Sequence, residues 1–103
     1  MIPKIAHGDP FQSTATHATA PTVTVTGVAG KSHYLTDLSV SSDKAGSILL
    51  VKDGTTVIWQ VQVGASFYTH HFEVPIKASV GADLVITIDS TSAGKANAGG
   101  VTL

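Results

Sequence analysis

The chain contains no cysteine among its 103 residues, and charged residues are scarce at 13%. Without cysteine it forms no disulfide and offers no thiol nucleophile, and such a chain suits assembly in a reducing cytoplasm. Six basic and seven acidic residues give a formal net charge of -1. This balance gives no reason to expect nucleic acid or an anionic membrane as a partner.

Long apolar runs are also missing. The opening stretch, MIPKIAHGDPFQ, lacks the uninterrupted apolar segment of a signal peptide. No window approaches the roughly 18 to 20 apolar residues that a membrane-spanning helix requires. We therefore expect a soluble, single-domain protein that is made and assembled inside a cell.

The low charge has two explanations, since globular domains usually carry about 25% charged residues. In the first, threonine, serine, alanine and glycine simply form the surface of a small β protein. In the second, neighbouring subunits or a larger lattice cover much of that surface. An isolated small domain normally needs more charge to stay in solution, so we favour the second and expect a homo-oligomer.

The stretch VKDGTTVIWQVQV, residues 51–63, predicts a β-hairpin. Asp53 and Gly54 are the residue types that tolerate the positive φ angles of a two-residue type I′ turn. In the second arm, alternate residues form an apolar face that we expect to be core, including the single tryptophan: Val57, Trp59, Val61 and Val63. The opposite face carries Ile58, Gln60 and Gln62, which are uncharged.

Further short strands are indicated by alternating or continuous apolar residues between turn signals. They lie in PTVTVTG, KSHYLTDLSVSS, SILLVKD, FYTHHFEVP and DLVITID, with VTL as a short last strand. Pro75 is expected to end the fourth of these, and STSAGKANAGG to form a loop. No segment has a helical period, so we predict an all-β fold, an antiparallel β-sandwich or jelly roll of about seven to eight strands.

Residues 1–20 show neither alternation nor a run of large apolar residues. We interpret them as an extended N-terminal arm, and residues 21–103 as the β-sandwich domain. The arm is either a loose terminus or a segment that becomes ordered on a neighbouring subunit. In the second case Ile2, Ile5 and Phe11 are its candidate partner-binding anchors.

No catalytic or metal-binding pattern is present in the sequence. His70 and His71 are adjacent, so in a strand they point to opposite faces, and no HxH or HExxH spacing brings two histidines together. There is no GxSxG motif, and the carboxylates are scattered among turns and strand ends. We expect a protein that is not an enzyme and that needs no metal or cofactor.

The order of four phrases carries a resemblance. These are GKSHYLT (30–36), LLVKDGTTVIW (49–59), EVPIKASVGADLVITI (73–88) and the ending AGGVTL. Together they resemble small structural proteins of tailed bacteriophages, over residues 28–103. The resemblance implies a non-enzymatic virion protein of the β-sandwich cement, decoration or head-fibre type, commonly a trimer, assembled in the host cytoplasm and placed on the capsid surface.

Two functions follow from this resemblance. The first is a cement or decoration protein that binds the major capsid protein or other virion proteins and stabilises the assembled head. The second is a receptor- or carbohydrate-binding module of a head fibre or tail tip, which would use loops such as residues 64–67 and 90–97. These loops contain one aromatic residue, Phe67, which weakens the carbohydrate interpretation.

Overall fold

The computed structural model describes residues 9–17, 22–44, 46–63, 65–88 and 94–103. Eight strands lie in these ranges: β1 (Asp9–His17), β2 (Thr22–Val25), β3 (His33–Ser41), β4 (Ile48–Asp53), β5 (Thr56–Gln62), β6 (Phe67–Lys77), β7 (Leu84–Ile88) and β8 (Gly94–Thr102). No helix capable of crossing a membrane occurs in the described part of the chain.

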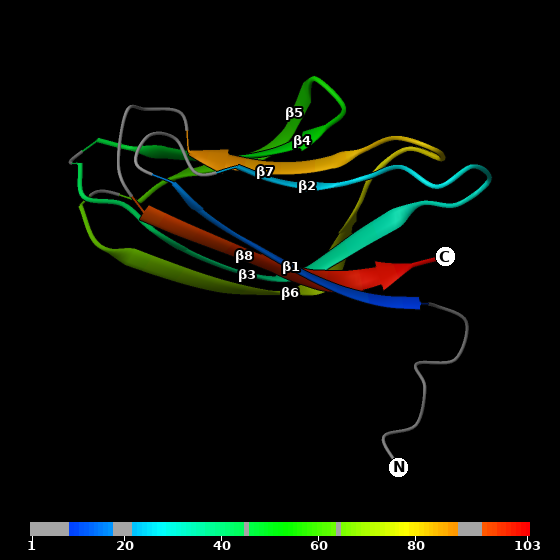
Figure 1. Cartoon of the computed structure of the whole chain (residues 1–103), viewed down its shortest axis with the longest axis horizontal. Coiled ribbons are helices and arrows are strands. Elements are labelled where there is room, and N and C mark those ends of the chain that lie inside the picture. The colour runs from blue at the N-terminus through cyan, green and yellow to red at the C-terminus, as the bar shows by residue number, and fades with distance from the viewer. Residues whose placement is uncertain (1–8, 18–21, 45, 64, 89–93) are drawn as a thin grey trace, which may run out of the picture.

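The strands form two four-stranded sheets that lie one above the other (Figure 1). The first sheet has the order β1-β8-β3-β6 and the second the order β2-β7-β4-β5, with every neighbouring pair antiparallel. Strand 1 therefore pairs with 8, 2 with 7, 3 with 6 and 4 with 5, as in one long hairpin rolled into two layers. This is the eight-stranded jelly roll, which confirms the predicted fold class.

The core lies between the sheets and is built from alternate residues of the strands. Leu35 and Val40 come from the first sheet, and Leu49, Val51 and Ile86 from the second; all five are almost completely buried. Ala96 and Ala98 of β8 are also buried, and their small side chains leave room for the larger residues opposite.

The structure corrects the predicted boundary at residue 20. Residues 9–17 form β1, which pairs with β8 along its whole length, from Asp9 opposite Thr102 to His17 opposite Gly94. Phe11 packs against the core of its own domain. The segment escaped prediction because Phe11 is its one large apolar residue, so it shows no alternation. Ile2 and Ile5 lie outside the described residues.

The partner strand was also misjudged. Of the expected loop 90–100, residues 94–100 belong to β8, and residues 90–93 lie outside the described part of the chain. Alanine and glycine dominate β8, so its sequence resembles that of a turn. Burial between two neighbouring strands overrides the weak β-propensity of these residue types.

Pro75 does not end β6. The strand continues to Lys77, but its register against β3 shifts between the pairs Leu35–Ile76 and Asp37–His71. Four residues of β6, 72–75, therefore lie opposite the single residue Thr36. Because β6 is at the edge of its sheet and bulged here, proline costs no ladder hydrogen bond.

The predicted hairpin is present, with its turn one residue later than expected. Asp53 pairs with Thr56, so Gly54 and Thr55 form the turn, and Gly54 has φ 63°. A bulge at Ile58 also shifts the register, because Trp59 pairs with Val51 and the next pair is Val57 with Lys52. The bulge removes Val57 from the core face, and its side chain is 43% exposed.

The other members of the predicted apolar face do lie toward the core. Trp59, Val61 and Val63 are partly buried and pack against it. The indole of Trp59 meets the ring of Phe72 edge-on, with 5.1 Å between centroids, and so joins the rims of the two sheets.

Candidate binding site

The outward side of the first sheet is polar across all four strands. The pairing places Gln12, Gly99, Asp37 and His71 in one row, from β1 to β6. The adjacent row contains Thr14, Asn97, Ser39 and Thr69. We call these two rows the polar face.

A shallow hollow of about 600 Å³ lies on the polar face. It is lined by residues of β1, β8, β3 and β6 and by none of the second sheet, which places it outside the sandwich. Each strand contributes a short consecutive stretch, so backbone as well as side chains forms its floor. The hollow is thus defined by the pairing of strands that are distant in sequence.

Two neighbouring glycines, Gly99 and Gly100, lie at the floor of the hollow, and packing requires glycine at only one of these two positions. A Cβ on Gly100 would lie 1.9 Å from the carbonyl oxygen of Tyr34 and 2.7 Å from the ring of Phe11, so packing requires glycine there. A Cβ on Gly99 would meet only the carbonyl oxygen of Phe11, at 3.7 Å, which is ordinary contact. Packing therefore does not require glycine at position 99, yet its missing side chain deepens the hollow.

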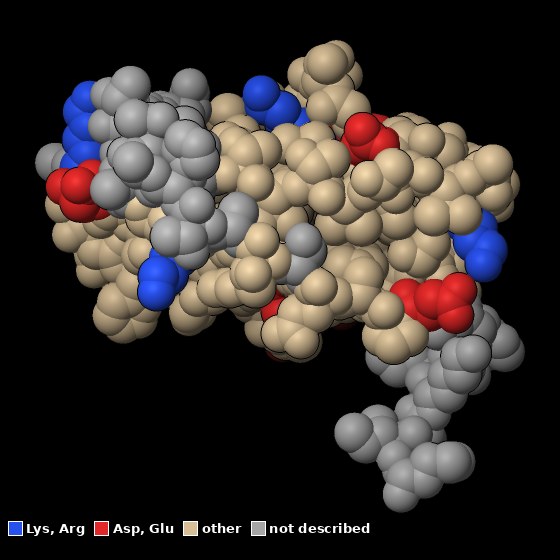
Figure 2. Space-filling view, in the orientation of Figure 1, with Lys and Arg blue, Asp and Glu red and all other residues tan. Residues whose placement is uncertain are grey.

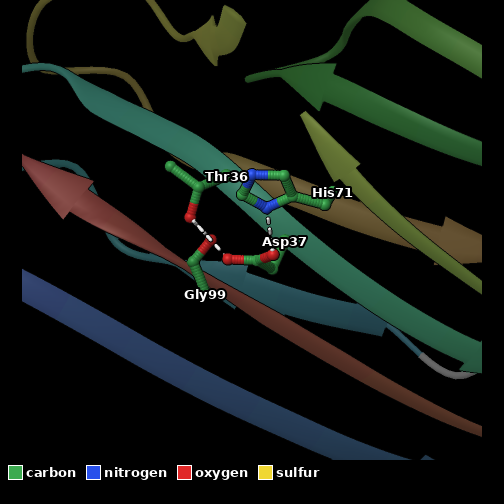
Figure 3. Close-up of polar contacts among 4 residues, drawn as sticks. All are labelled: Thr36, Asp37, His71 and Gly99. Carbon is green, nitrogen blue, oxygen red and sulfur yellow. Dashed lines mark hydrogen bonds and ion pairs between the residues drawn. The ribbon is translucent and has the colours of Figure 1, made fainter. Parts of the chain in front are cut away.

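Asp37 is the one carboxylate in the lining of the hollow (Figure 3). The Nδ1–H of His71 donates to its Oδ1 at 2.6 Å. The hydroxyl of Thr36 lies 2.9 Å from Oδ2 and 3.1 Å from the carbonyl oxygen of Gly99, and can donate to either. The hydrogen bond from His71, and next that from Thr36, hold the pKa of Asp37 below its usual range, so the group is ionised at neutral pH.

The arrangement of Asp37 depends on a bulge in β3. The register between β3 and β8 shifts between Leu35 and Asp37, which makes Thr36 an extra residue. This shift allows Leu35 to face the core and Asp37 to face outward. A bulge that redirects side chains is a common feature beside binding sites.

His33 and His70 make contacts within the domain and lie away from Asp37. Buried His33 donates from Nε2 to the carbonyl of Thr26 at 2.8 Å, and its Nδ1 lies 2.7 Å from the hydroxyl of Thr102. Half-buried His70 lies on the inner side of β6, 3.1 Å from the hydroxyl of Tyr68. Within the described residues, no group of three histidine or acidic side chains could hold a metal ion.

The outward side of the second sheet has a different character. Pairing brings together aliphatic and uncharged polar residues: Thr22, Thr24, Val85, Thr87, Ile48, Leu50, Val57, Gln60 and Gln62, with Lys52 as the one charged residue. We call this set the aliphatic face. Ile48 is 36% exposed, and Ile58 in the adjacent bulge is equally exposed. In Figure 2, which views the sandwich from one edge, most of the described surface is uncharged, and the basic and acidic side chains lie mainly around its margin.

The predicted site residues are distributed differently from expectation. Phe11 lies on the inner side of the first sheet, where its ring meets that of His33 edge-on at 5.7 Å. Of the predicted loop residues, Asn97 belongs to the polar face and Phe67 begins β6. Sequence reasoning missed Gln12 as a site residue, because nothing in the sequence gives its register against β8.

Comparison with known proteins gives distant likenesses only. No protein-family model matches the chain, and no curated protein matches it. Among solved structures it is similar to a periplasmic inhibitor of g-type lysozyme from Aeromonas hydrophila, with 12% identity and a TM-score of 0.36, over 98% of this chain and 91% of that one. It is also similar to the carbohydrate-binding module TmCBM61, solved with β-1,4-galactotriose, with 16% identity and a TM-score of 0.39, over 92% and 67% of the two chains. The fold assignment rests on the strand order of this chain.

Proposed function

We propose that the chain is a non-catalytic structural protein of a bacteriophage virion, a cement or decoration protein that binds the assembled head. The observation that carries the proposal is the aliphatic face, an exposed sheet surface with a single charged residue, Lys52. The sequence resemblance over residues 28–103 supports the same role. The jelly roll is compatible with it by analogy, since viral capsid domains are among the proteins that use this fold.

The aliphatic face has the composition of a surface that is covered in an assembly. Val57 is 43% exposed and Ile48 is 36% exposed, as is Ile58 in the bulge beside the face, and the core is complete without these three residues. Interface centres are depleted of charge in the same way. Burying apolar area contributes about 25 cal/mol per Å², and the contribution is repeated at every copy on a shell.

The partners in this role are the major capsid protein or other virion proteins, and a second and third copy of this chain in a trimer. The protein would be assembled in the host cytoplasm and would remain on the capsid surface. No catalytic step is part of the role.

The test combines light scattering with co-sedimentation on capsids that lack the protein. The wild-type chain should be an oligomer and should sediment with the capsids. Val57→Glu places a charge in the aliphatic face and should lose one or both properties without loss of thermal stability. Ala29→Glu, in an exposed turn, is the matched control and should behave as wild type.

A wild-type chain that is a monomer of 10.5 kDa and does not sediment with capsids would contradict the proposal. Equal sedimentation of wild type and Val57→Glu would show that another surface makes the contact.

A further inference from the structure

The polar face carries side chains that both donate and accept hydrogen bonds. The amides of Gln12 and Asn97 and the hydroxyls of Ser39 and Thr69 line the hollow from four different strands. None of these four side chains has a hydrogen-bond partner among the described residues. The hollow therefore offers a converging set of neutral groups to a molecule from outside.

The dimensions of the hollow suit a small ligand. Its volume of about 600 Å³ lies within the range of small-molecule sites, which is roughly 300 to 1,000 Å³. Gly99 lies at its floor between Asp37 and Gln12, and packing does not explain the glycine. A bound molecule that approaches the backbone closely would explain the glycine, because a larger side chain would stand in its way.

The charged residues in the lining of the hollow restrict the chemical class of the ligand further. The lining contains no lysine or arginine, and its one carboxylate, Asp37, is ionised and already accepts hydrogen bonds from His71 and Thr36. An anionic ligand would meet this negative charge without a lysine or arginine to compensate it. A metal cation would find one carboxylate where several oxygen ligands are needed. A neutral ligand rich in hydroxyl groups fits, because each hydroxyl can donate to Asp37 and accept from an amide.

The aromatic ring of Phe67 lies beside the polar face. Phe67 is 75% exposed and, by alternation along β6, faces the same side as Thr69 and His71. Its apolar ring gives the C–H face of a pyranose a surface on which to pack. A peptide added as a strand could pair only with the edge strands β1 and β6, at the margins of the hollow, because the central strands β8 and β3 are paired on both sides.

From these observations we propose that the hollow of the polar face binds a neutral saccharide. The hydroxyls of the sugar bond to Gln12, Asn97, Asp37 and Thr69, its ring lies over Gly99, and the adjoining residue of an oligosaccharide reaches Phe67. This site lies on the opposite side of the sandwich from the aliphatic face. Saccharide binding and capsid binding are therefore separable by mutation.

The test is a screen of the full-length chain on an array of neutral and acidic oligosaccharides, followed by NMR titration with the best neutral one. Binding to neutral members is expected, with amide shifts concentrated at residues 37–39 and 97–99. Gly99→Leu fills the floor and should weaken binding by about tenfold or more. Thr24→Leu, which introduces the same residue type at an exposed position of the other sheet, should leave binding unchanged.

Asn97→Ala is the second variant, which keeps the test valid if Gly99→Leu fails to fold. It removes an amide without adding volume and should weaken binding several-fold. The proposal is overturned if no neutral oligosaccharide binds, if binding is confined to acidic ones, or if folded Gly99→Leu and Asn97→Ala bind as tightly as wild type. Normal capsid binding in these variants would leave the assembly role intact.

Discussion

Replacing Phe11 by alanine tests whether β1 is an integral strand of the domain. The phenyl ring packs against the core, meets His33 edge-on and covers Gly100, where any side chain would collide with it. Truncating a fully buried phenylalanine costs about 3 to 5 kcal/mol. Phe11 is only partly buried, so we expect a loss of about 2 to 3 kcal/mol in the free energy of unfolding.

Urea denaturation of Phe11→Ala and wild type measures this difference directly. At roughly 4 °C per kcal/mol for a domain of this size, the melting temperature should also fall by about 8 to 12 °C. Gln12→Ala is the control, because Gln12 is the next residue of β1 and its side chain is exposed on the polar face. It should change stability by less than about 0.5 kcal/mol.

A loss of under about 0.5 kcal/mol in Phe11→Ala would refute the reasoning. It would mean that β1 contributes nothing to the packed domain, and that the segment is an arm after all.

Three further changes test other parts of the structure. Deleting residues 1–20 removes all of β1 and should abolish or severely weaken cooperative thermal unfolding; a deletion variant that melts like wild type would contradict the role of β1. Gly100→Ala should destabilise the protein by about 1 to 3 kcal/mol in urea, because its Cβ meets backbone and ring atoms, whereas Gly99→Ala should be nearly neutral. Equal effects of the two would show that the floor of the hollow is wrongly described. The folded-state pKa of Asp37 is lowered, so its interactions stabilise the protein above its unfolded pKa of about 3.9 and this stabilisation is lost as the pH falls through the folded pKa. The stability difference between wild type and Asp37→Asn should therefore shrink from pH 5 toward pH 2 in chemical denaturation, and a constant difference would count against the hydrogen bonds of Asp37.

The strands that could be predicted are those with large alternating side chains. In β7, Leu84, Ile86 and Ile88 face the core while Val85 and Thr87 face outward, and this period of two is visible in the sequence. In β8 alternate residues are also buried, but at its centre these are Ala96 and Ala98, and in β1 the one large apolar residue is Phe11. Small residues give no contrast between the faces, so these two strands could not be recognised.

The hollow could not be predicted because it depends on register and not on residue type. Asp37, Gly99 and His71 are adjacent only because strands that are far apart in sequence pair in one particular alignment. The bulge at Thr36 then shifts that alignment by one residue, which reverses the side to which each following side chain points. A single sequence states neither the pairing nor the bulge.

The position of β8 between β1 and β3 has a consequence for how the chain folds during synthesis. The second sheet is complete once Ile88 has left the ribosome, because its four strands all precede that point. The first sheet needs the last strand to be made, and the pairing of β1 with β8 spans nearly the whole chain, the kind of distant contact that forms slowly. A nascent chain that stops before residue 94 carries one finished sheet, a β3–β6 pair with an open edge, and a β1 with no strand to join, and such open edges invite pairing with other chains.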